Sequence, residues 1–325
     1  MEQGKGSGVL QHKINWHSQA LQTAIKAAVS IAALWLLFSW VGMGKISESL
    51  AGFDAFFILP ALLLLAVILA INAVNLKILT ECFGKISMAD AFWYSLSARA
   101  AGFVMPGKIG EFSYGAMMSK QGVSIAEGMA VVAVDKAMTF LALSIAGSFG
   151  IASLFPAQAT LAIGAIAVAW VAVAAGIMAL GNKGFTALVE RFFGKGVAGF
   201  SLAVKKISGN RLALAKNFAL TVIRMLLQAV FFLALFAGFG SAMGFAEMVF
   251  VVAVSIVISH LPFTLSGLGA REGAFVYLCT LYGAPAAAAG SVALLSLAMD
   301  CIFTAVAVIA KPAIQNILGW TKAKN

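Results

Sequence analysis

Charged residues are scarce in this sequence. They make up 10% of its 325 residues, whereas 62% of the residues are hydrophobic. Soluble globular proteins carry about 25% charged residues, so this composition excludes that class. Long apolar runs recur along the chain, and a run of about 20 residues suffices to cross a bilayer. The sequence therefore predicts an all-α polytopic membrane protein, with no polar stretch long enough to fold as a separate soluble domain.

Cysteine and histidine are also rare, with three residues of each. Cys82, Cys279 and Cys301 lie far apart and form no CxxC pair, so they predict neither a disulfide framework nor a metal site. The histidines form no cluster with metal-ligand spacing, and the HExxH, GxSxG and Walker A motifs are absent. We therefore expect no metal and no cofactor, and transport or lipid binding is favoured over catalysis.

Acidic residues are the scarcer charge class, at 12 against 22 basic residues, which gives a net charge of +10. The basic residues gather in tails and in one long polar interval, and Lys and Arg in such segments mark the cytoplasmic face. We expect three cytoplasmic segments: a tail at 1–19, a basic loop at 182–216 and a tail at 313–325. The positive charge then reflects topology and anionic lipid headgroups rather than nucleic acid. The expected location is the cytoplasmic membrane of a bacterium or archaeon, with both termini cytoplasmic.

Seven apolar segments predict helices in the membrane. They lie near 21–41, 55–76, 125–154, 161–180, 218–239, 246–261 and 286–310. Two stretches rich in glycine and charge interrupt this pattern, at about 88–122 and 259–283. The basic loops fix which membrane face each span starts from. Counted in this way, the first stretch begins and ends at the cytoplasmic face, and the second begins and ends at the opposite face. The simplest arrangement has about seven or eight spans, two re-entrant hairpins, and an inverted repeat of 45–181 and 217–312, which is typical of transporters.

The first broken stretch reads SARAAGFVMPGKIGEFSYG, residues 97–115. Its charged and helix-breaking residues are Arg99, Pro106, Gly107, Lys108, Gly110 and Glu111. Proline ends the preceding helix, and the glycines permit a close approach of the backbone. The free N–H groups at the start of the next helix suit a phosphate or carboxylate. Arg99 and Lys108 would add positive charge to such an anion site.

The second broken stretch, SHLPFTLSGLGAREGAFVY at residues 259–277, offers the same parts. These are His260, Gly267, Gly269, Arg271 and Glu272. Its turn resembles the first one, since PGKIGE and SGLGARE both place glycines before a glutamate. Each stretch is followed by a span that carries one aspartate. These parallels favour the inverted repeat.

Four ionisable residues lie inside predicted spans: Asp135, Lys136, Arg224 and Asp300. Charge in the hydrocarbon is costly, so each is expected to have a partner or a function. Asp135 and Lys136 are adjacent and face different sides of a helix, so they need not pair. The two aspartates are too short to reach the surface and are expected to find Arg or Lys partners. Arg224 could instead extend to the cytoplasmic surface, and the hairpin charges could simply pair with one another.

A family resemblance follows from the motifs in these two stretches. Residues 104–136 read VMPGKIGEFSYGAMMSKQGVSIAEGMAVVAVDK and residues 265–275 read LSGLGAREGAF. Together they resemble the transmembrane-region family of lysylphosphatidylglycerol synthetase, over about residues 20–312. The resemblance implies re-entrant helices and, in two-domain members, movement of an aminoacylated phospholipid between leaflets. This sequence holds no aminoacyltransferase domain, so we expect a stand-alone member that cannot make lysylphosphatidylglycerol.

The resulting hypothesis is a lipid flippase that moves an anionic or glycosylated headgroup through a polar site inside the membrane. The expected substrate-binding residues are Arg99, Lys108, Glu111, Arg271 and Glu272. The expected supporting residues are Pro106, Gly107, Gly110, Asp135, Lys136, Arg224, His260, Gly267, Gly269 and Asp300. One alternative is a membrane-embedded transferase with Glu111 or Glu272 as its base. Another is an accessory protein in polyprenyl-linked glycolipid or hopanoid biosynthesis. The lipid, the energy source and assembly into a homo-oligomer stay open.

Overall fold

The structure, a computed structural model, describes residues 6–105, 108–179, 196–261, 264 and 266–317. Within these residues the chain forms helices and no strand, which confirms the predicted all-α class. The α-helices are α1 (Gly6–Val41), α2 (Met43–Ala51), α3 (Ile58–Thr80), α4 (Met88–Val104), α5 (Ser113–Met118), α6 (Ile125–Leu154), α7 (Pro156–Ala179), α9 (Gly196–Gly209), α10 (Arg211–Gly238), α11 (Phe245–Ser259), α12 (Ala270–Leu281) and α13 (Ala286–Ile317). Three 3-10 turns are η1 (Ala55–Phe57), η2 (Ile109–Phe112) and η3 (Ser119–Gln121).

Five helical segments among the described residues are long and apolar enough to cross a membrane. They are Ala24–Val41, Ala55–Thr80, Ile125–Leu154, Arg211–Gly238 and Ala286–Val306. Two shorter apolar helical segments are Pro156–Ala172 and Phe245–Ser259. Each predicted apolar segment overlaps one of these helices. The described part of the interval 182–216, which is predicted as a basic cytoplasmic loop, holds α9 and the start of α10.

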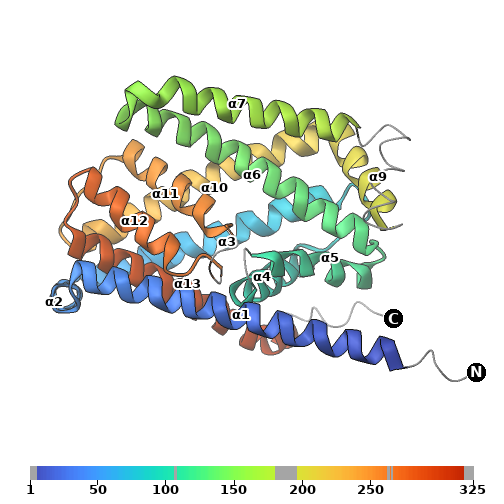
Figure 1. Cartoon of the computed structure of the whole chain (residues 1–325), viewed down its shortest axis with the longest axis horizontal. Helices are drawn as coiled ribbons and strands as arrows, with labels where there is room; N and C mark the ends of the chain where they lie inside the picture. Colours follow the sequence, from blue (N-terminus) through green and yellow to red (C-terminus); the bar gives the residue numbers. More distant parts are fainter. Residues whose placement is uncertain (1–5, 106–107, 180–195, 262–263, 265, 318–325) are drawn as a thin grey trace, which may run out of the picture.

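Helices α4, α11 and α12 are shorter than the five candidate spans. With 17, 15 and 12 residues, they extend about 25, 22 and 18 Å at 1.5 Å per residue, against about 30 Å of hydrocarbon. Helix α4 packs against η2 and α5, and α11 packs against α12. In Figure 1 the α4–α5 unit lies in the half of the bundle near α9, whereas α11 and α12 lie in the half near α2.

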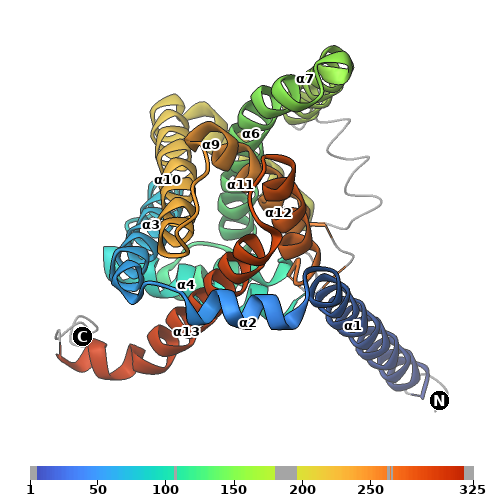
Figure 2. The ribbon, with the colours of Figure 1, turned by 90° about the vertical axis from the view of Figure 1, so that its left-hand side faces the viewer.

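The long helices surround these short ones. Helix α3 packs along α10, and α6 contacts both α10 and α11. Figure 2 shows α1 and α7 projecting at the edge of the molecule, away from the central group of helices. Buried residues of α3, α10, α11, α12 and α13, among them Leu65, Phe236, Val251, Phe275 and Val292, form the largest apolar cluster. The short helices are therefore held in the interior by apolar packing.

Two glycine contacts bring the first broken stretch against its neighbours. A Cβ on Gly110 would lie 2.3 Å from the carbonyl oxygen of Ala101 in α4. A Cβ on Gly128 of α6 would lie 2.4 Å from the Cα of Gly115 in α5. No side chain fits at such distances, so these positions need glycine for close approach of two backbones. Pro106 and Gly107, which were predicted to shape the same turn, lie outside the described residues.

Substitution of Gly128 by Ala is expected to lower the stability of the protein. The added methyl group must displace the backbone of α5, and overpacking of this kind costs about 1–3 kcal/mol. A Cβ on Gly147, in the same helix, would meet no neighbouring atom within 4 Å, so Gly147→Ala is the matched control. Thermal unfolding in detergent should show a lower Tm for Gly128→Ala only; equal Tm values for the two variants would contradict the contact.

Candidate functional site

A cavity of about 140 Å³ lies in the centre of the bundle, between the two broken stretches. It is much larger than the roughly 10–15 Å³ that one water molecule needs. Its charged lining residues and His260 come from both halves of the chain: Arg99, Lys108, Glu111, Asp135, Lys136, Arg224, His260, Arg271, Glu272 and Asp300. Apolar residues such as Leu65, Leu69, Phe231, Phe232 and Phe275 line it as well. The structure thus brings together all the charged residues that the sequence singled out.

The glycines of the second broken stretch shape the turn beside this cavity rather than line it. Gly267 and Gly269 both have φ of +81°, a conformation that favours glycine. A Cβ on Gly269 would lie 2.6 Å from the Cβ of Ala33 in α1. The Gly269 N–H donates to Oε2 of Glu272 at 2.8 Å, which fixes the start of α12. This turn therefore places Arg271 and Glu272 at the cavity wall.

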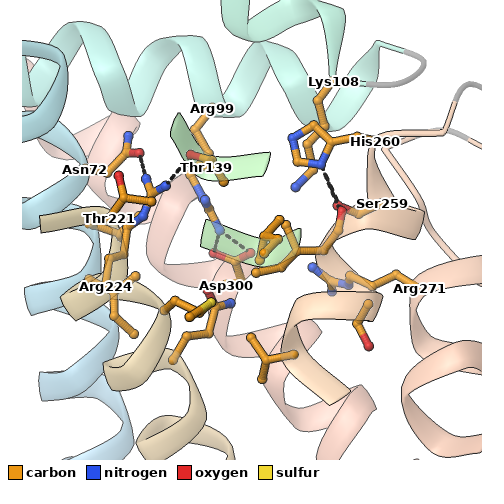
Figure 3. Close-up of a pocket in the computed structure, with 18 of the residues that line it drawn as sticks. Asn72, Arg99, Lys108, Thr139, Thr221, Arg224, Ser259, His260, Arg271 and Asp300 are labelled. Carbon is orange, nitrogen blue, oxygen red and sulfur yellow. Dashed lines mark hydrogen bonds and ion pairs between the residues drawn. The ribbon is translucent and has the colours of Figure 1, made fainter. Parts of the chain in front are cut away.

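The Arg99–Asp300 ion pair joins the two halves of the chain. Arg99 of α4 donates from Nη2 to both carboxylate oxygens of Asp300 in α13, each at 2.6 Å. Figure 3 shows the arginine reaching across the cavity to the aspartate. Asp300 was expected to find a basic partner, and this contact confirms it.

Two further carboxylates in the cavity wall also carry a basic partner. Glu111 of η2 pairs with Lys136 of α6. Glu272 is 2% exposed and accepts from Nε and Nη2 of Arg271 at 2.8 and 2.6 Å. Lys136 therefore does not pair with its neighbour Asp135. This agrees with the prediction that two adjacent residues face different sides of a helix. The alternative that hairpin charges pair with one another holds for Arg271 and Glu272.

Asp135 differs from the other three carboxylates. It was expected to find an Arg or Lys partner, and this expectation was wrong: Asp135 accepts from Nδ2 of Asn217 at 3.0 Å. Lys136 on the next helix position is taken by Glu111. Arg224 donates to Oδ1 of Asn72 and, at 3.0 Å, to Oγ1 of Thr139. The nearby basic residues are therefore directed elsewhere.

Arg224 and Lys108 are the two cavity cations without a carboxylate partner among the described residues. Arg224 turns inward toward α3 and α6, with neutral partners only (Figure 3); the alternative that it extends to the cytoplasmic surface was wrong. Lys108 makes no hydrogen bond or ion pair with any described residue, and its φ of 58° is left-handed. The cavity wall therefore holds two basic side chains that no carboxylate contacts directly.

His260 and Ser255 present polar atoms that the described residues leave unpaired. Nδ1 of His260 lies 2.9 Å from the carbonyl oxygen of Ile256, to which an Nδ1–H donates. In that neutral tautomer Nε2 is an acceptor, and it has no partner in the described structure. Oγ of Ser255 is likewise buried without one. Figure 3 places His260 next to Lys108 at the cavity. Both atoms can bond to a bound molecule.

The sequence reasoning missed the uncharged polar residues of the site. Asn72 and Thr139 hold Arg224, and Thr221, Gln228, Ser255 and Ser259 line the cavity. One signal was present in α10, where Asn217, Thr221, Arg224 and Gln228 follow helical spacing and share one face. A polar stripe of this kind in an apolar helix indicates a polar interior.

The cavity combines charged and apolar walls within a bundle of helices that are long and apolar enough to cross a membrane. The chain matches the family described as the lysylphosphatidylglycerol synthase TM region over residues 23–307. It therefore belongs to this family, which is a membrane domain of lipid-related proteins. The matched range includes both broken stretches and all the cavity-lining residues. A search of curated proteins found no match.

Removal of Arg99 is expected to destabilise the fold by leaving the Asp300 carboxylate buried without its partner. Truncating one member of a buried ion pair costs about 2–5 kcal/mol. Arg99→Ala should therefore lower Tm strongly, and Arg99→Ala with Asp300→Ala should recover part of the loss. Lys77→Ala is the control, because the Lys77–Glu81 pair lies at the end of α3 with Glu81 exposed and such pairs contribute about 0–1 kcal/mol. Additive losses in the double variant would contradict the pairing.

Proposed function

We propose that this protein moves a lipid with an anionic headgroup between the two leaflets, and that the headgroup binds in the central cavity. The observation that carries the proposal is the lining of this one cavity by the charges of both broken stretches and by apolar side chains. An amphiphile needs both surfaces at once.

The charge balance of the cavity favours an anionic headgroup. Five basic and four acidic side chains line it, which leaves one net positive charge with His260 neutral. Three of the carboxylates already hold a cation. Lys108 and Arg224 can therefore receive an anion such as a phosphate, to which Arg can donate two parallel hydrogen bonds. Nε2 of His260 can accept from a hydroxyl of the same headgroup.

The arrangement of the helices supports a transport mechanism. We infer that α4–α5 and α11–α12 are re-entrant hairpins that enter from opposite faces, since they are short and lie in opposite halves of the bundle. The segments 45–181 and 217–312 would then form an inverted repeat. In transporters of this design, two halves rock around a site near the midplane. The basic tails and the basic interval 182–216 would face the cytoplasm.

The pairing of the glutamates makes a transferase less well supported. A general base needs a carboxylate oxygen that can reach a substrate proton. Oε1 of Glu272 is engaged by Arg271 and Oε2 by the N–H of Gly269, and Glu111 is held by Lys136. An accessory role needs no charged cavity at all. Transport differs from both alternatives. It requires a charged cavity in which the headgroup can bind, but it does not require a carboxylate that is free to act as a base.

Arg224→Gln and Lys108→Gln are expected to slow lipid exchange by about tenfold or more, because a hydrogen bond to a charged group contributes about 1.5–3 kcal/mol. The measurement is leaflet exchange of labelled lipids of several headgroup classes in vesicles that contain the full chain. Arg211→Gln, on the exposed start of α10, and Lys120→Gln, in exposed η3, are matched controls.

Two results would contradict the proposal. One is the absence of exchange above that of empty vesicles for every headgroup class. The other is equal slowing by Arg224→Gln and Arg211→Gln. Deletion of the gene separates transport from a transferase, since loss of transport leaves the same lipid on the wrong leaflet, whereas loss of a transferase changes the lipid product.

A further inference from the structure

Asp135 is a buried carboxylate without an ion-pair partner among the described residues. It is 1% exposed and lines the cavity, and its side-chain partner is the amide of Asn217 at 3.0 Å. The other three carboxylates in the cavity wall each hold an Arg or Lys. A buried charge without a counter-charge is strongly unfavourable. Asp135 therefore has no direct ion-pair partner among the described side chains, and a bound cation or a proton would neutralise it.

The side chains around Asp135 provide many oxygen atoms that can accept hydrogen bonds and few groups that can donate them. Asn75 and Asn217 are both 0% exposed, and their Oδ1 atoms have no hydrogen-bond partner in the described structure. Nδ2 of Asn217 also donates to the carbonyl oxygen of Asn75 at 3.4 Å. Nδ2 of Asn75 donates to Oγ1 of Thr221 at 3.0 Å. These side chains from α3, α6 and α10 form one buried network.

We propose that this network, around Asp135, binds a monovalent cation, Na⁺ or K⁺. Hard cations bind through oxygen ligands such as carboxylates, amide oxygens and backbone carbonyls. One carboxylate balances one positive charge, which favours a monovalent ion over Ca²⁺ or Mg²⁺. No group of three His, Cys, Asp or Glu that could hold a metal ion occurs in the described residues. A proton on Asp135 would supply a single O–H donor, which serves at most one of the two buried amide oxygens.

The charges around this network suggest how the cation and the headgroup act together. Arg224 donates to Thr139, whose hydroxyl donates to the backbone oxygen of Asp135 at 2.9 Å. Lys136 is neutralised by Glu111, and the Tyr114 hydroxyl bonds to Thr80 at 3.0 Å. Arg224, which no carboxylate contacts directly, therefore partly offsets the charge of Asp135 and also opposes a bound Na⁺ or K⁺. This coupling argument rests on the proposed function, whereas the cation site itself does not.

An anionic headgroup on Arg224 would remove this repulsion. Binding of the anion and of the cation would then strengthen one another, and such coupling is reciprocal. Asp135 and Thr221 line the cavity, whereas Asn75 and Asn217 lie behind them. The cation would thus enter from the cavity. A cation gradient across the membrane could in this way drive movement of the headgroup.

The test is the thermal stability of the purified full chain in NaCl, KCl and choline chloride at equal ionic strength. A ligand that binds the folded state raises Tm with its concentration, and we expect a rise of at least about 2 °C for Na⁺ or K⁺ over choline. Asp135→Asn should lose the response and should be more stable than the wild type in choline, because its buried charge is gone. Asp54→Asn, at the exposed start of η1, should respond as the wild type does.

Thr221→Val removes an oxygen of the network without changing its charge, and it should need a higher salt concentration for the same Tm. It serves as the second variant if Asp135→Asn does not fold. A wild type with no response to Na⁺ or K⁺, or an equal response in Asp135→Asn, overturns the site. A response to pH alone identifies a proton and also overturns it. Because the assay requires no lipid movement, a cation response without leaflet exchange would refute only the proposed function.

Discussion

Neutralisation of charge inside an apolar bundle is the constraint on which this structure depends. A charged side chain in the hydrocarbon is costly unless it meets an opposite charge or bonding groups. Arg99 and Asp300 meet this requirement across the two halves of the chain, and Glu111 and Lys136 join η2 to α6. These contacts hold the short helices at the centre. They also determine which charges remain for a ligand.

The remaining charges form two groups in the cavity wall. Lys108 and Arg224 offer positive charge without a carboxylate, whereas Asp135 offers negative charge within a network of amide and hydroxyl oxygens. The first pair suits the phosphate of a lipid, and the second group suits a small cation. Membership in the lysylphosphatidylglycerol synthase TM region family connects this cavity with lipids. The apolar wall beside the charges is consistent with that connection.

The sequence predicted the elements of the fold well, and the partners less well. Glycine, proline and charge within apolar surroundings were sufficient to identify the two broken stretches, because such residues do not suit a lipid-facing helix. The partner of Asp135 was not predictable, since it depends on how α6, α3 and α10 pack. The contact between Gly115 and Gly128 was missed for the same reason. The polar stripe on α10 was visible in the sequence at residues 217, 221, 224 and 228.

The most direct test of the account is native mass spectrometry of the purified protein, with identification of the lipids that it retains. The account predicts that the wild type retains a lipid with a phosphate-bearing or other anionic headgroup. It further predicts that this lipid is lost when Arg224 is replaced by Gln and kept when Arg211 is replaced. Retention of the same lipid by both variants, or retention of neutral lipids alone, would contradict a headgroup site in the cavity.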